Sequence, residues 1–410
     1  MKIALLYLDV SNHGDLVIYQ CSKYIIQSIL EKHGIKDCEL VPVDIGSFRV
    51  KQQGGRTVEA PPSRLAVFQK AIRKTTNILG LNPLTEAILR FTWHLSNTYQ
   101  HYAANEREKL MDADLMVFCG GGMIKYHQQN FHYFIDDVTR IAQRRNVPVL
   151  MNSVGVEGYD EENVECQFLK RALNRPCMKF ISTRDDIDTL RSCYVAKPDI
   201  VTARVCDPAF WTVEAFGITE PSPERGKVGL NVIRQKIFKQ YMYAVSTTTL
   251  TQLYYELITK LVDAGYRVEL FSNGVESDGK LIEAIFAAHP ELREEKNLTT
   301  AYPATAQELV KTIATYERFM AVRLHASIVG TVLGIPNVSL VWNRKQILFG
   351  EQVGMPQNYI TKEGFTADNV YRLLMDAKPY SMDTEYKQSV YTSLEEQLMK
   401  YLGCRENEEE

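Results

Sequence analysis

The tripeptide Arg323-Leu324-His325 places a guanidinium and an imidazole at the end of a predicted strand, residues 318–323. A helix is predicted from His325 to Gly334, so the imidazole should lie at a helix N-terminus. An arginine beside a histidine suits an anionic substrate that also needs proton transfer. Lys345 follows the next predicted strand, 337–342, and should return to the same rim. The competing interpretation is a buried histidine next to a surface arginine.

Two more polar residues follow predicted strands in the first half of the chain. Arg184 comes after the strand 178–181, and its forked guanidinium can donate two hydrogen bonds to a carboxylate or a phosphate. Asp207 comes after the strand 201–206, immediately before a proline. The alternatives are an internal pair of Arg184 with Asp185 and an Asx turn at Asp207. Ligands of parallel sheets bind beyond the carboxyl ends of the strands, which is where both residues lie.

Three consecutive glycines, Gly120, Gly121 and Gly122, follow the predicted buried strand 114–119. Without side chains, their backbone N–H groups can approach a ligand closely and form an anion-binding nest. No Gly-Lys-Ser/Thr sequence follows, so this segment is not a nucleotide P-loop. Relief of crowding at a sheet edge is the other interpretation, but the position after a buried strand favours a ligand site. Lys125, just beyond, is predicted to be structural or solvent-facing.

The first predicted strand, residues 2–8, ends in the turn Asn12-His13-Gly14-Asp15. Gly14 permits a tight backbone turn. Asn12 and Asp15 can fix this loop or hold a sugar hydroxyl, whereas His13 is expected to be merely solvated. A helix N-cap at Asn12 or Asp15 would explain the turn without any ligand.

The elements that must position these residues alternate between short apolar strands and amphipathic helices. Such alternation predicts an α/β fold in which a parallel sheet is wrapped by helices. A linker with two prolines and two glycines, residues 217–226, interrupts the pattern. We therefore expect two Rossmann-like domains facing a central cleft: an N-terminal domain at 1–216 on the acceptor side and a C-terminal domain at 227–375 on the donor side. A C-terminal helix and acidic tail should occupy 376–410.

Residues 49–109 do not fit the alternation and are predicted to form a helical excursion, with helices near 63–79 and 84–110. They carry ten arginines and lysines against four glutamates, a net charge of +6, whereas the whole chain carries −3. Such a basic amphipathic segment can contact an anionic membrane surface or a lipid diphosphate. A helical subdomain with a solvated basic face is the alternative.

The composition excludes several classes of function. Of the 410 residues, 45% are hydrophobic and 24% are charged, as in a globular protein. No apolar run approaches the ~20 residues that span a bilayer, and the first residues are not typical of a signal peptide. The net charge of −3 leaves no footprint for nucleic acid over the whole chain. Eight scattered cysteines, without a C-x-x-C pair or a Cys/His cluster, predict reduced thiols in a cytoplasmic protein and no metal site.

In order and spacing, these motifs resemble the polysaccharide pyruvyltransferase family over roughly residues 1–360. The resemblance implies a GT-B-like fold and an enzyme that uses phosphoenolpyruvate as co-substrate, with no cofactor, to place a pyruvate ketal on a sugar. The acceptor would be a capsule or exopolysaccharide or its polyprenyl-diphosphate-linked precursor, met in the cytoplasm or at the inner face of the membrane. The motifs are Asn12-x-Gly14-Asp15, Gly120-Gly121-Gly122, Ser182-x-Arg184-Asp185, Asp207-Pro208-Ala209, Arg323-Leu324-His325 with Gly334-Ile335-Pro336, and Lys345.

The chemistry that the resemblance implies agrees with the residue types. Phosphoenolpyruvate carries a carboxylate and a phosphate, and ketal formation needs a proton delivered to its methylene carbon and protons removed from sugar hydroxyls. His325 is the predicted proton shuttle. Asp15 or Asp207 can steady an oxocarbenium-like C2. The cations expected to bind the donor, which match the family's donor-binding and catalytic positions, are Arg184, Arg323 and Lys345. Arg323 is also expected to be catalytic together with His325.

Two departures from the family pattern bear on the acceptor. The glycine-rich segment 152–158 lacks the family's proline, and Asn343 stands where an aspartate is often found. Two other functions stay open. The first is a nucleotide-sugar-dependent GT-B glycosyltransferase, for which Glu308 and Glu317 could hold the donor ribose although neither obviously ends a strand. The second is a non-catalytic glycan-binding protein of a polysaccharide assembly pathway.

Overall fold

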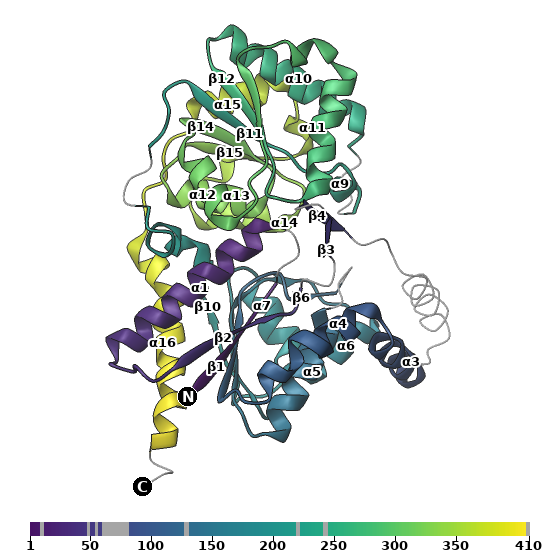
Figure 1. Cartoon of the computed structure of the whole chain (residues 1–410), viewed down its shortest axis with the longest axis vertical. Coiled ribbons are helices and arrows are strands. Elements are labelled where there is room, and N and C mark those ends of the chain that lie inside the picture. The colour runs from purple at the N-terminus through teal and green to yellow at the C-terminus, as the bar shows by residue number, and fades with distance from the viewer. Residues whose placement is uncertain are drawn as a thin grey trace.

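The computed structural model describes residues 1–8, 12–46, 50–53, 56–59, 82–126, 131–218, 222–240 and 245–406. It contains two six-stranded parallel sheets, each flanked by helices, which form two domains in contact with each other (Figure 1). The predicted α/β class with two Rossmann-like domains is confirmed.

The N-terminal sheet has the strand order β10-β9-β7-β5-β1-β2, with every neighbouring pair parallel. Its central strands are almost completely buried, as expected for a sheet covered on both faces. The strands are β1 (Lys2–Tyr7), β2 (Glu39–Asp44), β5 (Leu115–Cys119), β7 (Val149–Val154), β9 (Met178–Thr183) and β10 (Val201–Arg204), with a small pair β6 (Ile124–Lys125) and β8 (Val156–Glu157). The helices are α1 (His13–Lys32), α5 (Phe131–Arg144), α6 (Val164–Leu173), α7 (Ile187–Thr189) and α8 (Thr212–Ala215).

The C-terminal sheet repeats this design in the order β13-β12-β11-β14-β15-β16, again all parallel. Its strands are β11 (Lys227–Asn231), β12 (Arg267–Phe271), β13 (Leu298–Ala301), β14 (Arg318–Ala321), β15 (Asn337–Leu340) and β16 (Tyr359–Ile360). Its helices are α9 (Lys236–Gln240), α10 (Thr247–Asp263), α11 (Glu276–Ala288), α12 (Ala306–Ala314), α13 (Leu324–Val332), α14 (Arg344–Gln352) and α15 (Ala367–Asp376).

The excursion at 49–109 differs from the prediction of helices alone. It begins with an antiparallel hairpin of β3 (Val50–Gln53) and β4 (Arg56–Glu59), and the predicted helix at 63–79 lies outside the described residues. The single helix predicted at 84–110 is wrong, because the structure has α3 (Asn82–His94), α4 (Asn97–Asn105) and a 3-10 turn at 107–110. The break follows from Ser96, whose hydroxyl accepts a hydrogen bond from the backbone N of Tyr99 at 3.2 Å and caps α4.

The two domains are held together by α1 and by the last helix, α16 (Thr384–Glu406). Helix α1 packs against α12 and α13 of the other domain. Helix α16 returns to the N-terminal domain, where Lys387 pairs with Glu214 at 2.5 Å and the Ser389 hydroxyl accepts a hydrogen bond from the Cys206 backbone N at 2.9 Å (Figure 1). One hydrophobic core includes side chains of both domains and of α16, so the contact between the domains is apolar as well as polar.

Candidate functional site

Arg184, Asp207 and His325 meet where the two domains touch. Arg184 directly follows β9 and Asp207 lies beyond the end of β10, its neighbour in the N-terminal sheet. His325 comes from the other domain, in the first turn of α13. Nη1 of Arg184 donates a hydrogen bond to Oδ2 of Asp207 and lies 3.2 Å from Nε2 of His325, which lies 3.8 Å from the same carboxylate oxygen. The structure thus joins three of the predicted site residues into one triad.

The triad is buried and charged. Arg184, Asp207 and His325 are 6%, 2% and 7% exposed. Burial alone would raise the pKa of Asp207, but Arg184 and His325 hold it well below its usual range. Burial alone would lower the pKa of Arg184, but Asp207, Asp185 and Asp15 raise it above its ordinary value. Within the described part of the chain, Nε of Arg184 has no hydrogen-bond partner, which leaves a buried donor for a ligand.

Lys345 forms a second polar link between the domains. It lies in the first turn of α14, and its Nζ is 2.7 Å from Oε1 of Glu157 on β8. Nζ of Lys125 is 3.7 Å from Oε2 of Glu157, and Nδ2 of Asn343 donates to Oε1 at 3.0 Å. Burial alone would raise the pKa of Glu157, but Lys345 and Lys125 lower it to about 2. Of the two roles predicted for Lys125, the structural one holds, because its partner Glu157 also binds Lys345 of the other domain.

The predicted glycines lie beside these side chains. A Cβ on Gly14 would lie 2.6 Å from Cβ of His325, so the first turn of α1 could not approach the triad with any larger residue. A Cβ on Gly122 would lie 3.0 Å from Nζ of Lys345. Gly120 and Gly121 have φ of +68° and +85°, in the left-handed region that glycine tolerates best. The lack of a side chain at Gly14 and Gly122 thus permits the close approach of the two domains.

Asn12 caps α1, as one of the two interpretations of this turn predicted. Its Oδ1 accepts a hydrogen bond from the backbone N of Gly14 at 3.2 Å, and its Nδ2 donates to Asp15 at 3.1 Å. A sugar-binding role for either side chain stays a prediction. The backbone N of His13 donates to the backbone O of Asn273 at 2.9 Å, so this turn also joins the two domains. The prediction that His13 is solvated is wrong, because its side chain is buried.

Arg323 has a different partner from His325. It precedes α13, and its guanidinium binds Asp278 of α11 through two nitrogens, with Nε 2.8 Å from Oδ2 and Nη2 2.8 Å from Oδ1. Asp278 is completely buried. The backbone N of Arg323 donates to Oδ1 of Asn231 at 3.0 Å. These contacts fix the turn that presents His325, and a role of Arg323 on the donor stays a prediction.

Two cavities adjoin the triad. The smaller, of about 10 Å³, is lined by Arg184, Asp207 and Lys345 and by apolar side chains of α13 and α14, and it has room for about one water molecule. The larger, of about 580 Å³, lies at the carboxyl ends of β12 and β13 and is lined by His13, Tyr302 and neighbouring residues. Because His13 precedes Gly14, which touches His325, this larger cavity lies close to the triad.

Neither a metal centre nor a membrane span is found in the described residues. They contain no group of three or more His, Cys, Asp and Glu side chains that could hold an ion. None of the helices in that part of the chain is long and apolar enough to cross a bilayer.

The sequence alone missed the two carboxylates that hold the predicted cations, Glu157 on Lys345 and Asp278 on Arg323. Asp278 gave no signal, because it lies within a helix and far along the chain from its partner. Glu157 lies in the segment 152–158, and it accepts a hydrogen bond from Asn343, which is one of the two departures from the family pattern. An aspartate at position 343 would set two carboxylates against each other.

Comparisons with known proteins bear on the family and the fold. A family model described as polysaccharide pyruvyl transferase matches residues 12–344. No curated protein is significantly similar in sequence. Among solved structures, the chain resembles UDP-GlcNAc 2-epimerase from Methanocaldococcus jannaschii, with a TM-score of 0.57, 10% identity, and coverage of 98% of this chain and 100% of that one. UDP-GlcNAc 2-epimerase from Neisseria meningitidis bound to UDP-GlcNAc gives a TM-score of 0.55, also with 10% identity and coverage of 98% and 100%. At this identity the likeness establishes the GT-B-like fold alone.

Proposed function

The chain belongs to the polysaccharide pyruvyl transferase family, and from that premise we propose that it transfers pyruvate from phosphoenolpyruvate to two hydroxyls of a sugar, forming a ketal and releasing phosphate. The sugar belongs to a cell-surface glycan or its lipid-linked precursor. The observation that carries the proposal is the buried triad of Arg184, Asp207 and His325, with Lys345 at the same contact between the domains.

The donor needs cations for its carboxylate and its phosphate. Arg184 offers its unpartnered Nε from one domain, and Lys345 offers its ammonium from the other. Glu157 now occupies the place on Lys345 that a donor anion would take. Binding of phosphoenolpyruvate therefore exchanges one anion for another at Lys345. Asp278 holds Nε and Nη2 of Arg323, so only its Nη1 is left for the donor while this pair is intact.

His325 is positioned to move the protons of the reaction. We assign to it delivery of one proton to the methylene carbon of phosphoenolpyruvate, which turns C2 into an oxocarbenium-like centre. The carboxylate of Asp207, 3.8 Å from Nε2 of His325, lies close enough to steady this positive charge. Two sugar hydroxyls add to C2 and the phosphate leaves. Of the two hydroxyl protons, one restores His325 and the other departs with the phosphate, so the scheme balances without a metal or a cofactor.

The cavity of about 580 Å³ beside His13 is the proposed site of the acceptor sugar. It lies between the first turn of α1 and the carboxyl ends of β12 and β13, where ligands of parallel sheets bind. Because β12 and β13 belong to the C-terminal domain, this proposal departs from the expectation that the acceptor side is the N-terminal domain. Its walls include the hydroxyl-bearing Ser272 and Tyr302, which suit a polyhydroxylated ligand. A titration of candidate sugars against Tyr302→Ala would test this placement through the KM of the acceptor.

Release of phosphate from phosphoenolpyruvate in the presence of a lipid-linked oligosaccharide panel tests the proposed function, with mass spectrometry of the product. We expect His325→Ala to slow phosphate release about 10²–10⁴-fold. His33→Ala, at an exposed end of α1, is the matched control. Near wild-type release by His325→Ala would refute the role of His325. Thermal stabilisation by UDP or GDP sugars but not by phosphoenolpyruvate would instead indicate a nucleotide-sugar glycosyltransferase, and sugar binding without phosphate release would indicate a glycan-binding protein.

A further inference from the structure

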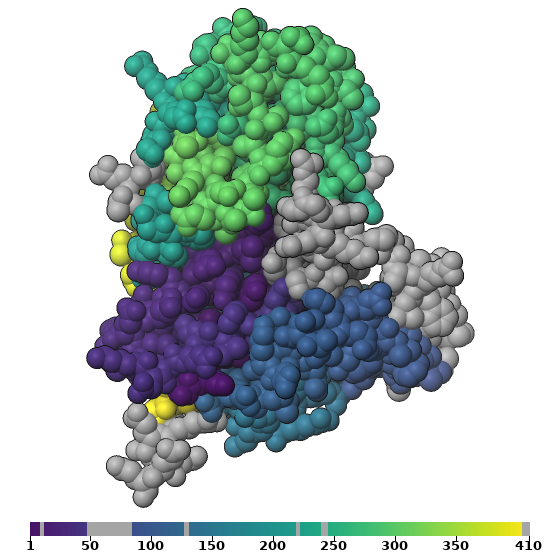
Figure 2. All heavy atoms as spheres, viewed as in Figure 1, coloured from purple at the N-terminus to yellow at the C-terminus, as the bar shows by residue number. Residues whose placement is uncertain are grey.

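Helix α3 lies at the outer edge of the N-terminal domain (Figure 1) and reaches the molecular surface drawn in Figure 2. The helix and Leu95, directly after it, expose a row of large apolar side chains. Leu84, Phe91 and Leu95 are 54%, 65% and 56% exposed, and Ile88 between them is partly exposed. Their spacing of four, three and four residues places them on one side of the helix. In the described part of the chain only four other large apolar side chains are exposed, and they are scattered over other elements. The row is therefore a local feature that folding of the domain does not explain.

A cleft rich in arginine lies beside this row. It has a volume of about 260 Å³ between α3, α4 and α5. Its charged walls hold four arginines against two aspartates: Arg90, Arg107, Arg140, Arg144, Asp136 and Asp137. Arg90 and His94 line the cleft, and the exposed Phe91 and Leu95 each follow one of them by a single position on α3. The apolar row therefore borders the cleft.

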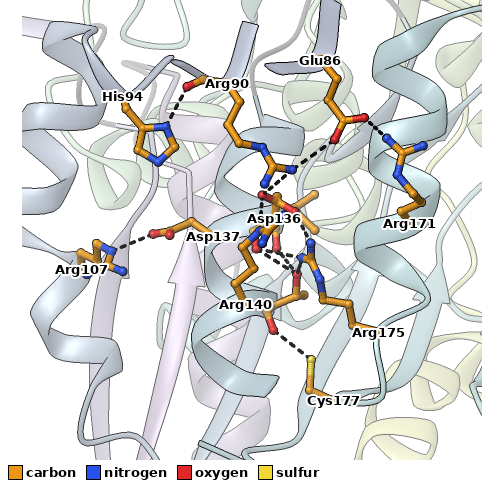
Figure 3. Close-up of polar contacts among 12 residues, drawn as sticks. Glu86, Arg90, His94, Arg107, Asp136, Asp137, Arg140, Arg171, Arg175 and Cys177 are labelled. Carbon is orange, nitrogen blue, oxygen red and sulfur yellow. Dashed lines mark hydrogen bonds and ion pairs between the residues drawn. The ribbon is translucent and has the colours of Figure 1, made fainter. Parts of the chain in front are cut away.

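The carboxylates near the cleft pair with three of its four arginines, and Arg90 also lies 3.2 Å from Glu86, but the carboxylates are fewer than the arginines. Figure 3 shows Asp136 shared by Arg90, Arg140 and Arg175, at 3.5 Å from Nη2 of Arg90 and 2.9 Å from Nε of Arg140. Nε of Arg107 lies 3.0 Å from Oδ2 of Asp137, which forms a further ion pair. Arg144 is exposed and has no ion pair with any described residue, so the cleft has an excess of positive charge.

We propose that this face, the apolar row of α3 with the arginine cleft, docks on an anionic lipid bilayer. The apolar side chains would enter the interfacial region, and the arginines would take the phosphates of the headgroups. The excess of positive charge favours a membrane as the partner. An apolar row alone would fit any apolar surface, whereas a row bordered by more arginines than carboxylates matches a surface that is apolar beneath a layer of phosphates. A docked enzyme would meet a lipid-linked acceptor at the membrane, and in this respect the inference rests on the proposed function. Vesicle binding itself needs neither substrate nor turnover.

Co-sedimentation of the full chain with vesicles tests this surface. We expect binding to vesicles of phosphatidylglycerol and phosphatidylcholine, little binding to phosphatidylcholine alone, and weakening at high salt. Phe91→Glu should weaken binding at least about tenfold. Arg144→Ala should weaken it about fivefold. The matched controls are Val201→Glu, an exposed apolar residue on β10, and Arg293→Ala in the other domain, and both should bind as the wild type does.

Results that contradict membrane docking would each indicate a different role for this face. Equal binding to neutral and anionic vesicles, or equal loss in Phe91→Glu and Val201→Glu, would overturn the proposal. Binding of inorganic phosphate by calorimetry without vesicle binding would show a site for a soluble anion instead. A change of oligomeric state in Phe91→Glu, measured by light scattering, would show that a second copy covers the row, and a fall in its unfolding temperature would show that the chain itself does. Unchanged phosphate release with a soluble acceptor separates all of these outcomes from a failure of the proposed chemistry.

Discussion

Replacing Glu157 by glutamine should weaken the link between the domains in a pH-dependent way. Its pKa of about 2, against an ordinary value of 4.5, means that folding favours its charged form. That difference corresponds to about 3 kcal/mol of unfolding free energy. Because the folded pKa is the lower one, the contribution is complete above about pH 4.5 and is lost as the pH falls toward 2. Loss of one partner of a buried pair has a cost of similar size, about 3–5 kcal/mol.

The assay is urea unfolding of the wild type and Glu157→Gln, followed by tryptophan fluorescence at pH 7, 4 and 3. We expect a difference of about 3 kcal/mol at pH 7 that shrinks steadily below pH 4.5. Asn343→Asp should also destabilise at pH 7, because it replaces the amide that donates to Glu157 at 3.0 Å by a second carboxylate. Glu283→Gln, on an exposed pair, is the control. A difference that stays constant between pH 7 and 3 would refute the electrostatic reasoning.

Three further predictions concern the packing around the site. Gly14→Ala should displace His325, since its Cβ would lie 2.6 Å from Cβ of that residue, and kcat should fall in steady-state assays without a large change in fold by circular dichroism. Arg323→Ala should lower the free energy of unfolding by about 3–5 kcal/mol by leaving Asp278 buried and unpaired, and Asp278→Ala in the same chain should recover part of that loss in urea unfolding. A thiol reagent at pH 8 should label no buried cysteine before unfolding, because burial raises the pKa of the thiols of Cys21, Cys119 and Cys206.

The sequence predicted the fold because the buried parallel strands are nearly continuous apolar runs. Both the strand at 115–119 and the strand at 149–154 are buried. The first was visible as such a run, and the second only through its first three residues, because Asn152 and Ser153 interrupt its apolar sequence. Helix boundaries were less certain, because caps decide them. Helix α1 begins at His13, before its first apolar residue Leu16, since Asn12 caps it. The break at Ser96 was missed for the same reason.

The sequence predicted the residues of the site only where they directly follow a strand. Arg184 and Asp207 were found because they follow neighbouring strands, and the structure joins them. Position along the chain could not show which carboxylate would meet which cation. Arg323 and His325 are two residues apart, yet the turn into α13 sends one to Asp278 and the other to Arg184. Pairing of this kind depends on the packing of distant segments, which local sequence does not encode.

The polar links between the domains suggest how donor binding and domain closure depend on each other. The space between Arg184 and Lys345 has a volume of about 10 Å³, far smaller than phosphoenolpyruvate, so the proposed donor can enter only if this contact loosens. The link of Lys345 with Glu157 opposes this entry, because it neutralises the cation that the proposed donor needs. A donor anion at Lys345 repels Glu157, whereas it attracts Arg184 from the other domain. The same charges that close the empty site can therefore close it again around a dianion, with His325 already beside Arg184.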